Sequence, residues 1–364
     1  EMAESKGMST GIVSTARLTH ATPAATYAHT PERKWENDSK LTEEAVAHGC
    51  KDIASQFLSF SYGDGIDVAM GGGRREFMPK SLVDIEGKHG KRSDGRDLRI
   101  EWKEANQNAT YIETLKAFNE VNVTLTSKLL GLFNPSHMRY EADRKNDIKG
   151  DPSLTQMTGK AIEILQKNEK GFVLVIESGR IDHAHHAGNA FNAFSDTIEF
   201  SNAAALADKM TSDKDTLIIV TADHSHVFTM AGYPKRGNPI LGKVRSTDKH
   251  GFVKEKDEVA VDGLPYTTLG YANGRGFMDL GDETDAAKGY EVEVHTHGRV
   301  DMAKMDTTKP GFHQEATVPL EYETHGGEDV GIYVKGPGSH LLSGVIEQNV
   351  IFHVMEHMGN LTNK

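Results

Sequence analysis

Imidazole and carboxylate side chains gather at three places in the sequence, and each place adjoins a run of apolar residues. The clusters are 177–186, 221–226 and 324–329, beside the apolar runs 172–176, 216–220 and 330–334. Continuous apolar runs of this length are typical of strands that are covered on both faces of a parallel sheet. Ligands of such sheets bind beyond the strand ends. We therefore expect the three clusters to meet at one rim of one sheet and to form a metal site.

The residue types suggest which ions would bind. Asp182 and His186 are four residues apart, so a helix would place them on one face where both could hold one ion. Carboxylate and imidazole without thiolate suit zinc in an open, catalytic site. Asp223 and His224 can converge where a strand ends. Glu177 offers only oxygen, which suits a harder ion such as magnesium.

Other candidate motifs are weaker. His183 and His185 would point away from the Asp182 face and are better suited to hydrogen bonds that support the ligands. His295 and His297 lie in an irregular stretch without neighbouring carboxylates, and we expect them not to bind metal. The glycine-rich stretch 71–75 lacks the Lys-Ser/Thr ending of a phosphate-binding loop, so a tight turn after a strand is the better interpretation.

Composition excludes several classes of protein. The 364 residues carry a formal net charge of −12, which disfavours a nucleic-acid partner because phosphate binding needs clustered Lys and Arg. No stretch approaches the roughly 18 apolar residues of a membrane span. The single cysteine, Cys50, rules out an internal disulfide framework and a cysteine-rich zinc site.

The periodicity of apolar residues indicates an α/β protein. We expect strands at 11–15, 66–70, 172–176, 216–220 and 330–334, and helices at 41–58, 158–168, 185–210 and 345–358. The order strand, helix, strand over 172–220 predicts a parallel βαβ unit. Residues 232–323 are rich in charge, Gly and Pro. We interpret them as an insertion that divides the core into 1–231 and 324–364.

At this point a family resemblance becomes visible. Four segments closely resemble the metal-binding segments of alkaline phosphatases, namely 177–186, 221–228, 323–330 and 13–33. The overall sequence pattern is nearest to the animal and marine-bacterial forms of the family. The resemblance covers almost the whole chain. It implies a three-layer sandwich around a central, mostly parallel sheet, with 232–323 as a crown-like insertion and with N-terminal strands missing.

The resemblance also implies a set of metal ligands. One zinc would be held by Asp182, His186 and His325, a second zinc by Asp223 and His224, and magnesium by Glu177 and the Thr22 hydroxyl. His20 and His226 would hydrogen-bond the groups around these ions. Arg33 would clamp the phosphate, which a planar guanidinium can do with two parallel hydrogen bonds.

A calcium site is a further implication of the resemblance. The carbonyl of Phe133, the carboxylate of Asp151 and the carboxylate of Glu101 match the family pattern. Asn134 departs from it, because the family has a carboxylate at that position.

The implied activity is hydrolysis of phosphate monoesters through a phosphoserine intermediate, by an exported homodimer without a transmembrane segment. The family's nucleophile lies in an Asp-Ser-Ala segment, and no such segment occurs in these residues. No catalytic serine is therefore assigned, and the chain resembles the family without its N-terminal portion. We expect the 364 residues alone to have little or no phosphatase activity and to be poorly stable.

Three alternatives stay open at this stage. The chain could be a truncated homologue that binds metal or phosphate without catalysis. It could be a sulfatase or phosphodiesterase relative, although Arg33 and the Thr22/Glu177 pair favour phosphomonoesters. Cys50 could be a free thiol, or it could pair with a cysteine outside these residues, as the resemblance to animal forms implies.

Overall fold

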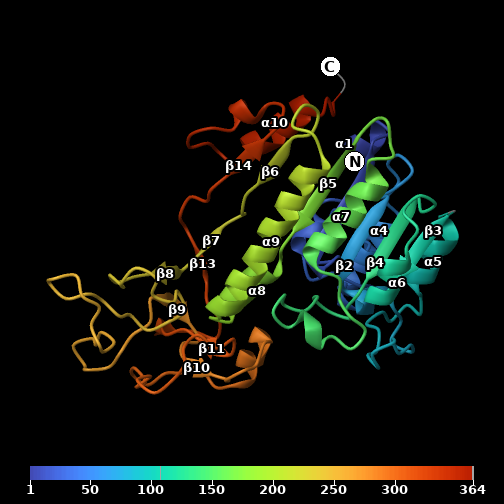
Figure 1. The fold of residues 1–364 in the computed structure, drawn as a ribbon. Coiled ribbons are helices and arrows are strands. Elements are labelled where there is room, and N and C mark those ends of the chain that lie inside the picture. The colour runs from blue at the N-terminus through green and yellow to red at the C-terminus, as the bar shows by residue number, and fades with distance from the viewer. Residues whose placement is uncertain (107, 363–364) are drawn as a thin grey trace.

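The fold is built on a parallel sheet of five strands, in a computed structural model that describes residues 1–106 and 108–362. The strand order is β3 (Ala109–Ile112), β4 (Lys128–Leu132), β2 (Val68–Gly72), β1 (Ser9–Arg17) and β5 (Phe172–Glu177). All four neighbouring pairs are parallel. The predicted α/β class with a central parallel sheet is therefore confirmed (Figure 1).

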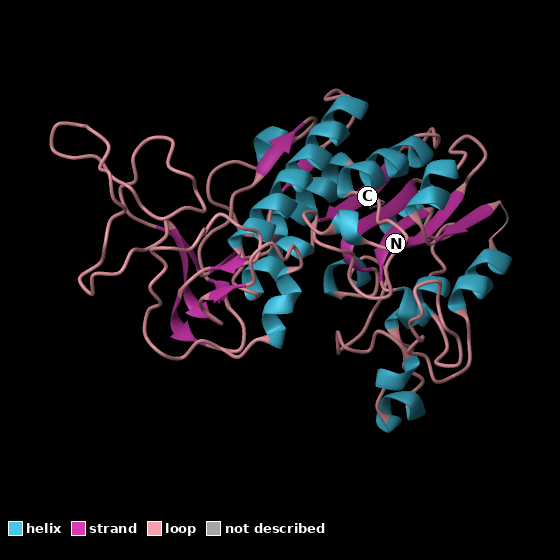
Figure 2. Ribbon diagram, turned by 60° about the horizontal axis from the view of Figure 1, so that its bottom comes forward, coloured by secondary structure: helices cyan, strands magenta, loops and turns pink. Residues whose placement is uncertain are grey.

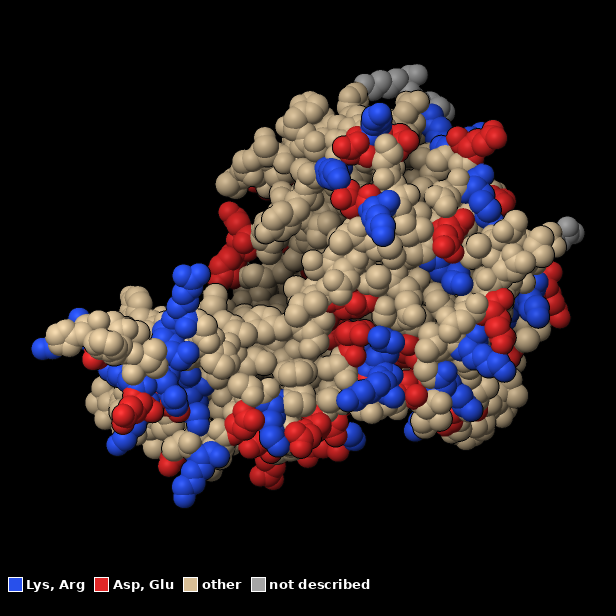
Figure 3. Space-filling view, viewed as in Figure 1, with Lys and Arg blue, Asp and Glu red and all other residues tan. Residues whose placement is uncertain are grey.

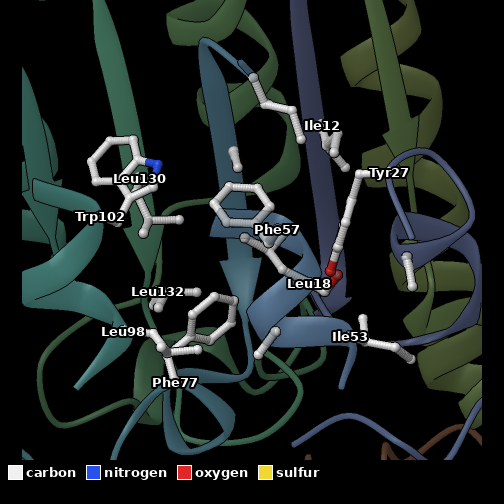
Figure 4. Packing of buried hydrophobic residues seen from close by; sticks show 14 residues of the cluster. Ile12, Leu18, Tyr27, Ile53, Phe57, Phe77, Leu98, Trp102, Leu130 and Leu132 are labelled. Carbon is white, nitrogen blue, oxygen red and sulfur yellow. Dashed lines mark hydrogen bonds between the residues drawn. The ribbon is translucent and has the colours of Figure 1, made fainter. Parts of the chain in front are cut away.

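Helices cover both faces of this sheet (Figure 2). Successive strand residues point to opposite faces, so Ile12 packs in one core cluster and Val13 in the other. The first cluster includes side chains of α4 (Ile53–Leu58) and α5 (Leu98–Ala105), as Figure 4 shows. The second includes side chains of α7 (Leu154–Leu165) and α9 (Ala190–Met210).

Two long helices expected from periodicity are each divided in the structure. The predicted helix 41–58 is α3 (Glu43–Ala47) followed by α4, because Gly49 takes a left-handed φ of 73° and Asp52 caps the second helix. The predicted helix 185–210 is α8 (Arg180–His186) followed by α9, with Gly188 at a φ of 74° between them. Apolar periodicity continued through both glycines and concealed the breaks.

The strands beside the three clusters do not share one sheet, so the expected single rim and the parallel βαβ unit over 172–220 are wrong. β6 (Ile218–Val220) pairs with β14 (Tyr333–Lys335) in a separate antiparallel sheet and does not join β5. Within the described residues, β5 is thus an edge strand of the larger sheet. The antiparallel direction of β14 explains how a cluster that precedes a strand can lie beside clusters that follow strands.

Residues 232–323 form loops and short strands beyond the end of α8 (Figure 1). Figure 3 shows that the surface is hollowed between this segment and the C-terminal part of the chain, and that acidic and basic side chains are interspersed in groups with uncharged surface between them. The division into 1–231, 232–323 and 324–364 stays a prediction. The short strands within this segment are β9 (Leu269–Gly274), β10 (Met278–Asp279), β11 (Phe312–His313) and β12 (Ala316–Pro319). Three more short strands flank it, namely β7 (Ser225–His226) and β8 (Phe228–Met230) before it and β13 (His325–Gly326) after it.

The remaining elements are short, except for the closing helix α10 (Asn349–Met358), which begins four residues later than predicted. None of the described helices is both long and apolar enough to cross a membrane. The other α-helices are α1 (Met2–Ser5), α2 (Ala21–Ala24) and α6 (Leu115–Glu120), and the 3₁₀ turns are Asp38–Lys40, Arg74–Phe77, Arg144–Asn146, Ala286–Glu291 and Ser339–Leu341.

Candidate metal centre

The three sequence clusters meet in space around the carboxylate of Asp182. The Asp182 Oδ1 atom lies 3.3 Å from His186 Nε2 and 3.4 Å from His325 Nε2, and the two Nε2 atoms are 3.3 Å apart. Zinc bonds of about 2.0–2.1 Å in tetrahedral geometry would separate neighbouring ligand atoms by about 3.3–3.4 Å. The three residues predicted to hold one zinc therefore form a triangle of the size that zinc needs.

The polar atoms of this triangle fit a cation. Asp182 Oδ1 is buried and, among the described residues, has no partner in hydrogen-bond geometry. Burial opposes ionisation, but contacts with His186 and His226 outweigh it and hold the pKa of Asp182 far below its usual value. Burial likewise opposes protonation of His186, yet its contact with Asp182 raises the pKa of His186 to about 10. The negative charge of Asp182 therefore favours a positive charge between these atoms, either a proton on His186 or a metal ion.

The second predicted zinc pair lies beside this triangle. His224 Nδ1 donates to the carbonyl oxygen of Ser225, at 3.1 Å, which leaves Nε2 free to face the site. That Nε2 atom is 3.5 Å from Asp223 Oδ2 and 3.9 Å from Asp182 Oδ1. The His224 ring stacks on the His325 ring at a centroid distance of 3.6 Å. Asp223 is exposed, so this pair is more open to solvent than the triangle.

Oxygen atoms converge on Glu177 at the end of β5. The Ser14 hydroxyl of β1 donates to Glu177 Oε2, because the parallel register places Ser14 opposite Glu177. The Thr22 hydroxyl also hydrogen-bonds this carboxylate. Burial raises the pKa of Glu177, and the two hydroxyl contacts oppose that rise. An all-oxygen set of this kind suits magnesium. Ser14 was not predicted, since a serine within a strand carries no signal in sequence.

Three half-buried imidazoles form a second cluster, whose ring nitrogens lie close enough together to hold a metal ion. The rings of His20, His137 and His183 lie with centroids 4.2–5.6 Å apart. Arg33 Nη2 is 3.2 Å from His20 Nε2, and Arg180 Nη1 is 3.1 Å from His183 Nδ1.

Because guanidinium N–H groups only donate, these two ring nitrogens accept and the opposite ring nitrogens carry the protons. A metal ligand needs the reverse arrangement. The contact also places the exposed guanidinium of Arg33 against His20, the residue predicted to hydrogen-bond groups around the ions.

The predicted calcium ligands do not all come together. The Phe133 carbonyl accepts from Arg74 Nη1 at 3.2 Å. Asp151 is buried, and burial together with the charge of Asp147 raises the pKa of Asp151 to about 7. Glu101 instead lies on the outer side of α5, where its carboxylate pairs with Arg96. The calcium site with Glu101, Phe133 and Asp151 therefore stays a prediction, and in the absence of an ion the Glu101 carboxylate has Arg96 as its partner.

The other histidines singled out in the sequence have local partners. His295 Nε2 donates to the carbonyl of Gly298 at 2.8 Å, and His297 is exposed. His185 stacks on His226 at a centroid distance of 4.6 Å, and its Nδ1 lies 2.9 Å from the Tyr271 hydroxyl. His226 Nε2 lies 3.1 Å from Asp182 Oδ1, next to the predicted zinc ligands.

Glu323 is the largest omission of the sequence prediction. Its carboxylate is fully buried and receives a hydrogen bond from His226 Nδ1, at 2.7 Å. Burial would raise the pKa of Glu323, but its contacts with His186 and His226 lower it to about 2. Its position two residues before His325 was the available signal, since the same segment was already singled out for its histidine.

Carboxylate and imidazole side chains gathered in this way could hold the metal ions that metal-dependent hydrolases use. A family model described as alkaline phosphatase matches residues 1–361. The chain therefore belongs to the alkaline phosphatase family.

Characterised relatives agree with this assignment. The chain is 42% identical over 363 residues to the tissue-nonspecific isozyme of Gallus gallus, and 42% identical over 372 residues to that of Homo sapiens. These alignments cover 98% of the chain but 64% of each relative, so the chain spans less than two thirds of their length. An alkaline phosphatase of Gadus morhua is 41% identical, with 70% of its length covered.

Solved structures support the fold alone. The alkaline phosphatase of the Antarctic bacterium TAB5 aligns with a TM-score of 0.60 at 23% identity, covering 100% of this chain and 75% of that chain. The Thermus thermophilus enzyme aligns with a TM-score of 0.62 at 23% identity, covering 100% and 73%. One TAB5 structure is a His 135 Glu mutant with Mg bound in its M3 site.

Proposed function

We propose that this chain carries the metal- and phosphate-binding part of an enzyme that hydrolyses phosphate monoesters. The observation that supports the proposal most directly is the triangle of Asp182, His186 and His325, with ligand atoms 3.3–3.4 Å apart. Family membership adds the substrate class, because the relatives are named alkaline phosphatases.

In this proposal each cluster holds one ion. The triangle would hold one zinc, Asp223 and His224 a second zinc, and Glu177 with Thr22 would hold magnesium. When bound, zinc supplies Lewis-acid polarisation of a phosphoryl oxygen. The carboxylate of Asp182 keeps its negative charge for the cation, since its pKa is held far below the usual value against the cost of burial.

Arg33 would orient the phosphate. Its side chain is exposed, and Nη2 contacts His20 Nε2 at 3.2 Å, so the guanidinium is held on one side while other N–H groups stay available. A guanidinium can donate two parallel hydrogen bonds to one phosphate, which fixes the orientation of the substrate. Calcium at Asp151, a homodimer and export from the cell complete the proposal by analogy with the family.

Turnover by these 364 residues alone is a separate question. They contain no Asp-Ser-Ala segment, which favours metal and phosphate binding without catalysis for this exact chain. The enzyme proposal assigns the serine nucleophile and its phosphoserine intermediate to a longer polypeptide. The sequence that precedes Glu1 in the gene decides between the two candidates.

Two measurements on the purified chain test the proposal. Metal analysis after dialysis against zinc should show bound zinc that decreases in a His325→Ala variant. Equilibrium binding of inorganic phosphate to the zinc-loaded chain should weaken in an Arg33→Ala variant. Hydrolysis of a chromogenic phosphomonoester should be negligible for this chain. Normal turnover would refute the inactivity, and absence of zinc binding would refute the metal centre.

A further inference from the structure

We propose that Glu323 is a positioning residue that orients the imidazoles of His186 and His226 toward Asp182. The inference rests on the proposed zinc-binding function of the same site. Glu323 has an exposed fraction of 0% and is the buried acidic residue nearest in sequence to the predicted ligand His325. Its backbone carbonyl is the nearer partner of His186, whose Nδ1 also lies 3.4 Å from Glu323 Oε2, and its carboxylate is the partner of His226.

The backbone of Glu323 holds His186. His186 Nδ1 donates to the Glu323 carbonyl oxygen at 2.6 Å, and the Glu323 amide donates to the His186 carbonyl at 3.1 Å. A carbonyl oxygen can only accept, so Nδ1 must carry a proton. His186 Nε2 is therefore the nitrogen left for the ion, and it lies 3.3 Å from Asp182 Oδ1.

The side chain of Glu323 holds His226. His226 Nδ1 donates to Glu323 Oε2 at 2.7 Å, and the backbone amide of Val227 donates to Oε1, also at 2.7 Å. Both carboxylate oxygens are thus occupied, which fixes the carboxylate plane. The Nε2 atom of His226 lies 3.1 Å from Asp182 Oδ1, so this ring points at the same carboxylate oxygen as His186.

This arrangement is the opposite of the one in the cluster of His20, His137 and His183. There, Arg33 and Arg180 donate to ring nitrogens of His20 and His183. Around Glu323 the imidazoles donate outward to oxygen and leave a lone pair facing inward. Outward donation to a carboxylate or carbonyl orients a metal-binding histidine and increases its basicity.

A glutamine substitution tests the role of the carboxylate. Glu323→Gln keeps the side-chain shape but replaces one acceptor oxygen with an NH₂ group, so His226 Nδ1 or the Val227 amide loses its acceptor. We expect zinc affinity, measured by competition with a chromophoric chelator, to fall about 10- to 100-fold. Glu321→Gln is the matched control, because Glu321 is exposed and pairs with Arg275. It should bind zinc like the native chain.

The outcomes separate this inference from the proposed function. If the native chain binds zinc and folded Glu323→Gln binds it equally well, the positioning role is overturned while the metal centre stands. If the native chain binds no zinc, both are overturned.

Nitrogen-15 NMR of the zinc-loaded native chain gives a second test that needs no variant. We expect proton-bearing Nδ1 atoms in both His186 and His226. A proton on Nε2 of His186 in the loaded protein would contradict the inference.

Discussion

One half of the molecule contains β1 to β4, and the other contains β5 to β14 and α10. The two halves bury their strands to very different degrees. Every residue of β2 and β4 is buried, whereas none of the six residues of β5 is fully buried, although all but the last are apolar. The difference follows from pairing: β2 and β4 have strands on both sides, while β5 and β6 each have one neighbour among the described residues. The metal ligands lie in the less buried half, where fewer packing contacts hold them in place.

The less buried half gains less folding free energy from packing. Apolar burial is the main source of folding free energy, and the half that contains β14 and α10 exposes large side chains such as Tyr333 and Phe352. Metal binding can supply stability that packing does not, because ions bind the folded site in preference to the unfolded chain. Four predictions test how far the two halves differ.

A matched pair of leucines should show the largest difference. Leu130 in β4 is fully buried, and Leu174 in β5 is half-buried. We expect Leu130→Ala to lower the free energy of unfolding by about 2–5 kcal/mol, because it removes buried surface and leaves a cavity. Leu174→Ala should cost less than half as much. Equal losses in urea denaturation of the metal-free chain would show that the two halves are equally well packed.

Zinc should stabilise one half selectively. At a free zinc concentration about a thousand times the dissociation constant, the gain is about 4 kcal/mol for one site. Hydrogen exchange should slow around α8, β7 and β13 under conditions where β2 and β4 change little. The His325→Ala variant should lose most of this effect. If zinc slowed hydrogen exchange equally in both halves, the expected selective stabilisation of the metal-binding half would be contradicted.

The metal-free site should respond to pH through His186. Its contact with Asp182 outweighs burial and raises its pKa from 6.5 to about 10. The contribution to stability is therefore complete below pH 6.5 and is lost as the pH rises to about 10. Because the ring is partly exposed, we expect only about 1–2 kcal/mol from this effect.

The measurement compares native and His186→Asn chains in EDTA. Their difference in free energy of unfolding should shrink between neutral pH and pH about 10. A constant difference over that range would mean that the proton on His186 contributes nothing.

The smallest effect should come from the surface pair of Arg96 and Glu101. Both side chains are exposed, and such pairs contribute about 0–1 kcal/mol. Glu101→Gln should change the unfolding free energy by less than about 0.5 kcal/mol. Calcium titration by calorimetry should be unaffected. Loss of calcium binding in this variant would restore Glu101 as a ligand.

Sequence reasoning located the site better than it located the sheet. The spacing of Asp182 and His186 and the clusters beside apolar runs indicated side chains that the structure brings together, while their role as metal ligands stays a prediction. The expectation that β5 and β6 share one sheet was wrong, since an apolar run indicates a buried strand but not which strand lies beside it. Gly49 and Gly188 broke helices that apolar periodicity alone extends.

The contacts that support the ligands were the least predictable. Ser14 reaches Glu177 only because β1 and β5 pair in one particular register. Glu323 reaches His226 across a separation of 97 residues. Neither has a local pattern, and an acidic residue in a charged segment looks like ordinary surface until the chain is folded. Glu101 shows the converse, since a plausible acidic position is taken by a neighbouring arginine.

β7 pairs with β13, and this pairing makes the geometry of the metal centre independent of the length of the segment between the two strands. It pairs His325 with His226 and Gly326 with Ser225, at the two ends of the segment that contains 232–323. Added or lost residues within that segment leave the histidines in place as long as these two pairs persist. A slip of one residue would turn His325 to the other face of the strand. We therefore expect changes of length within this segment to preserve the metal centre, whereas an insertion beside either of the two pairs would displace the histidines.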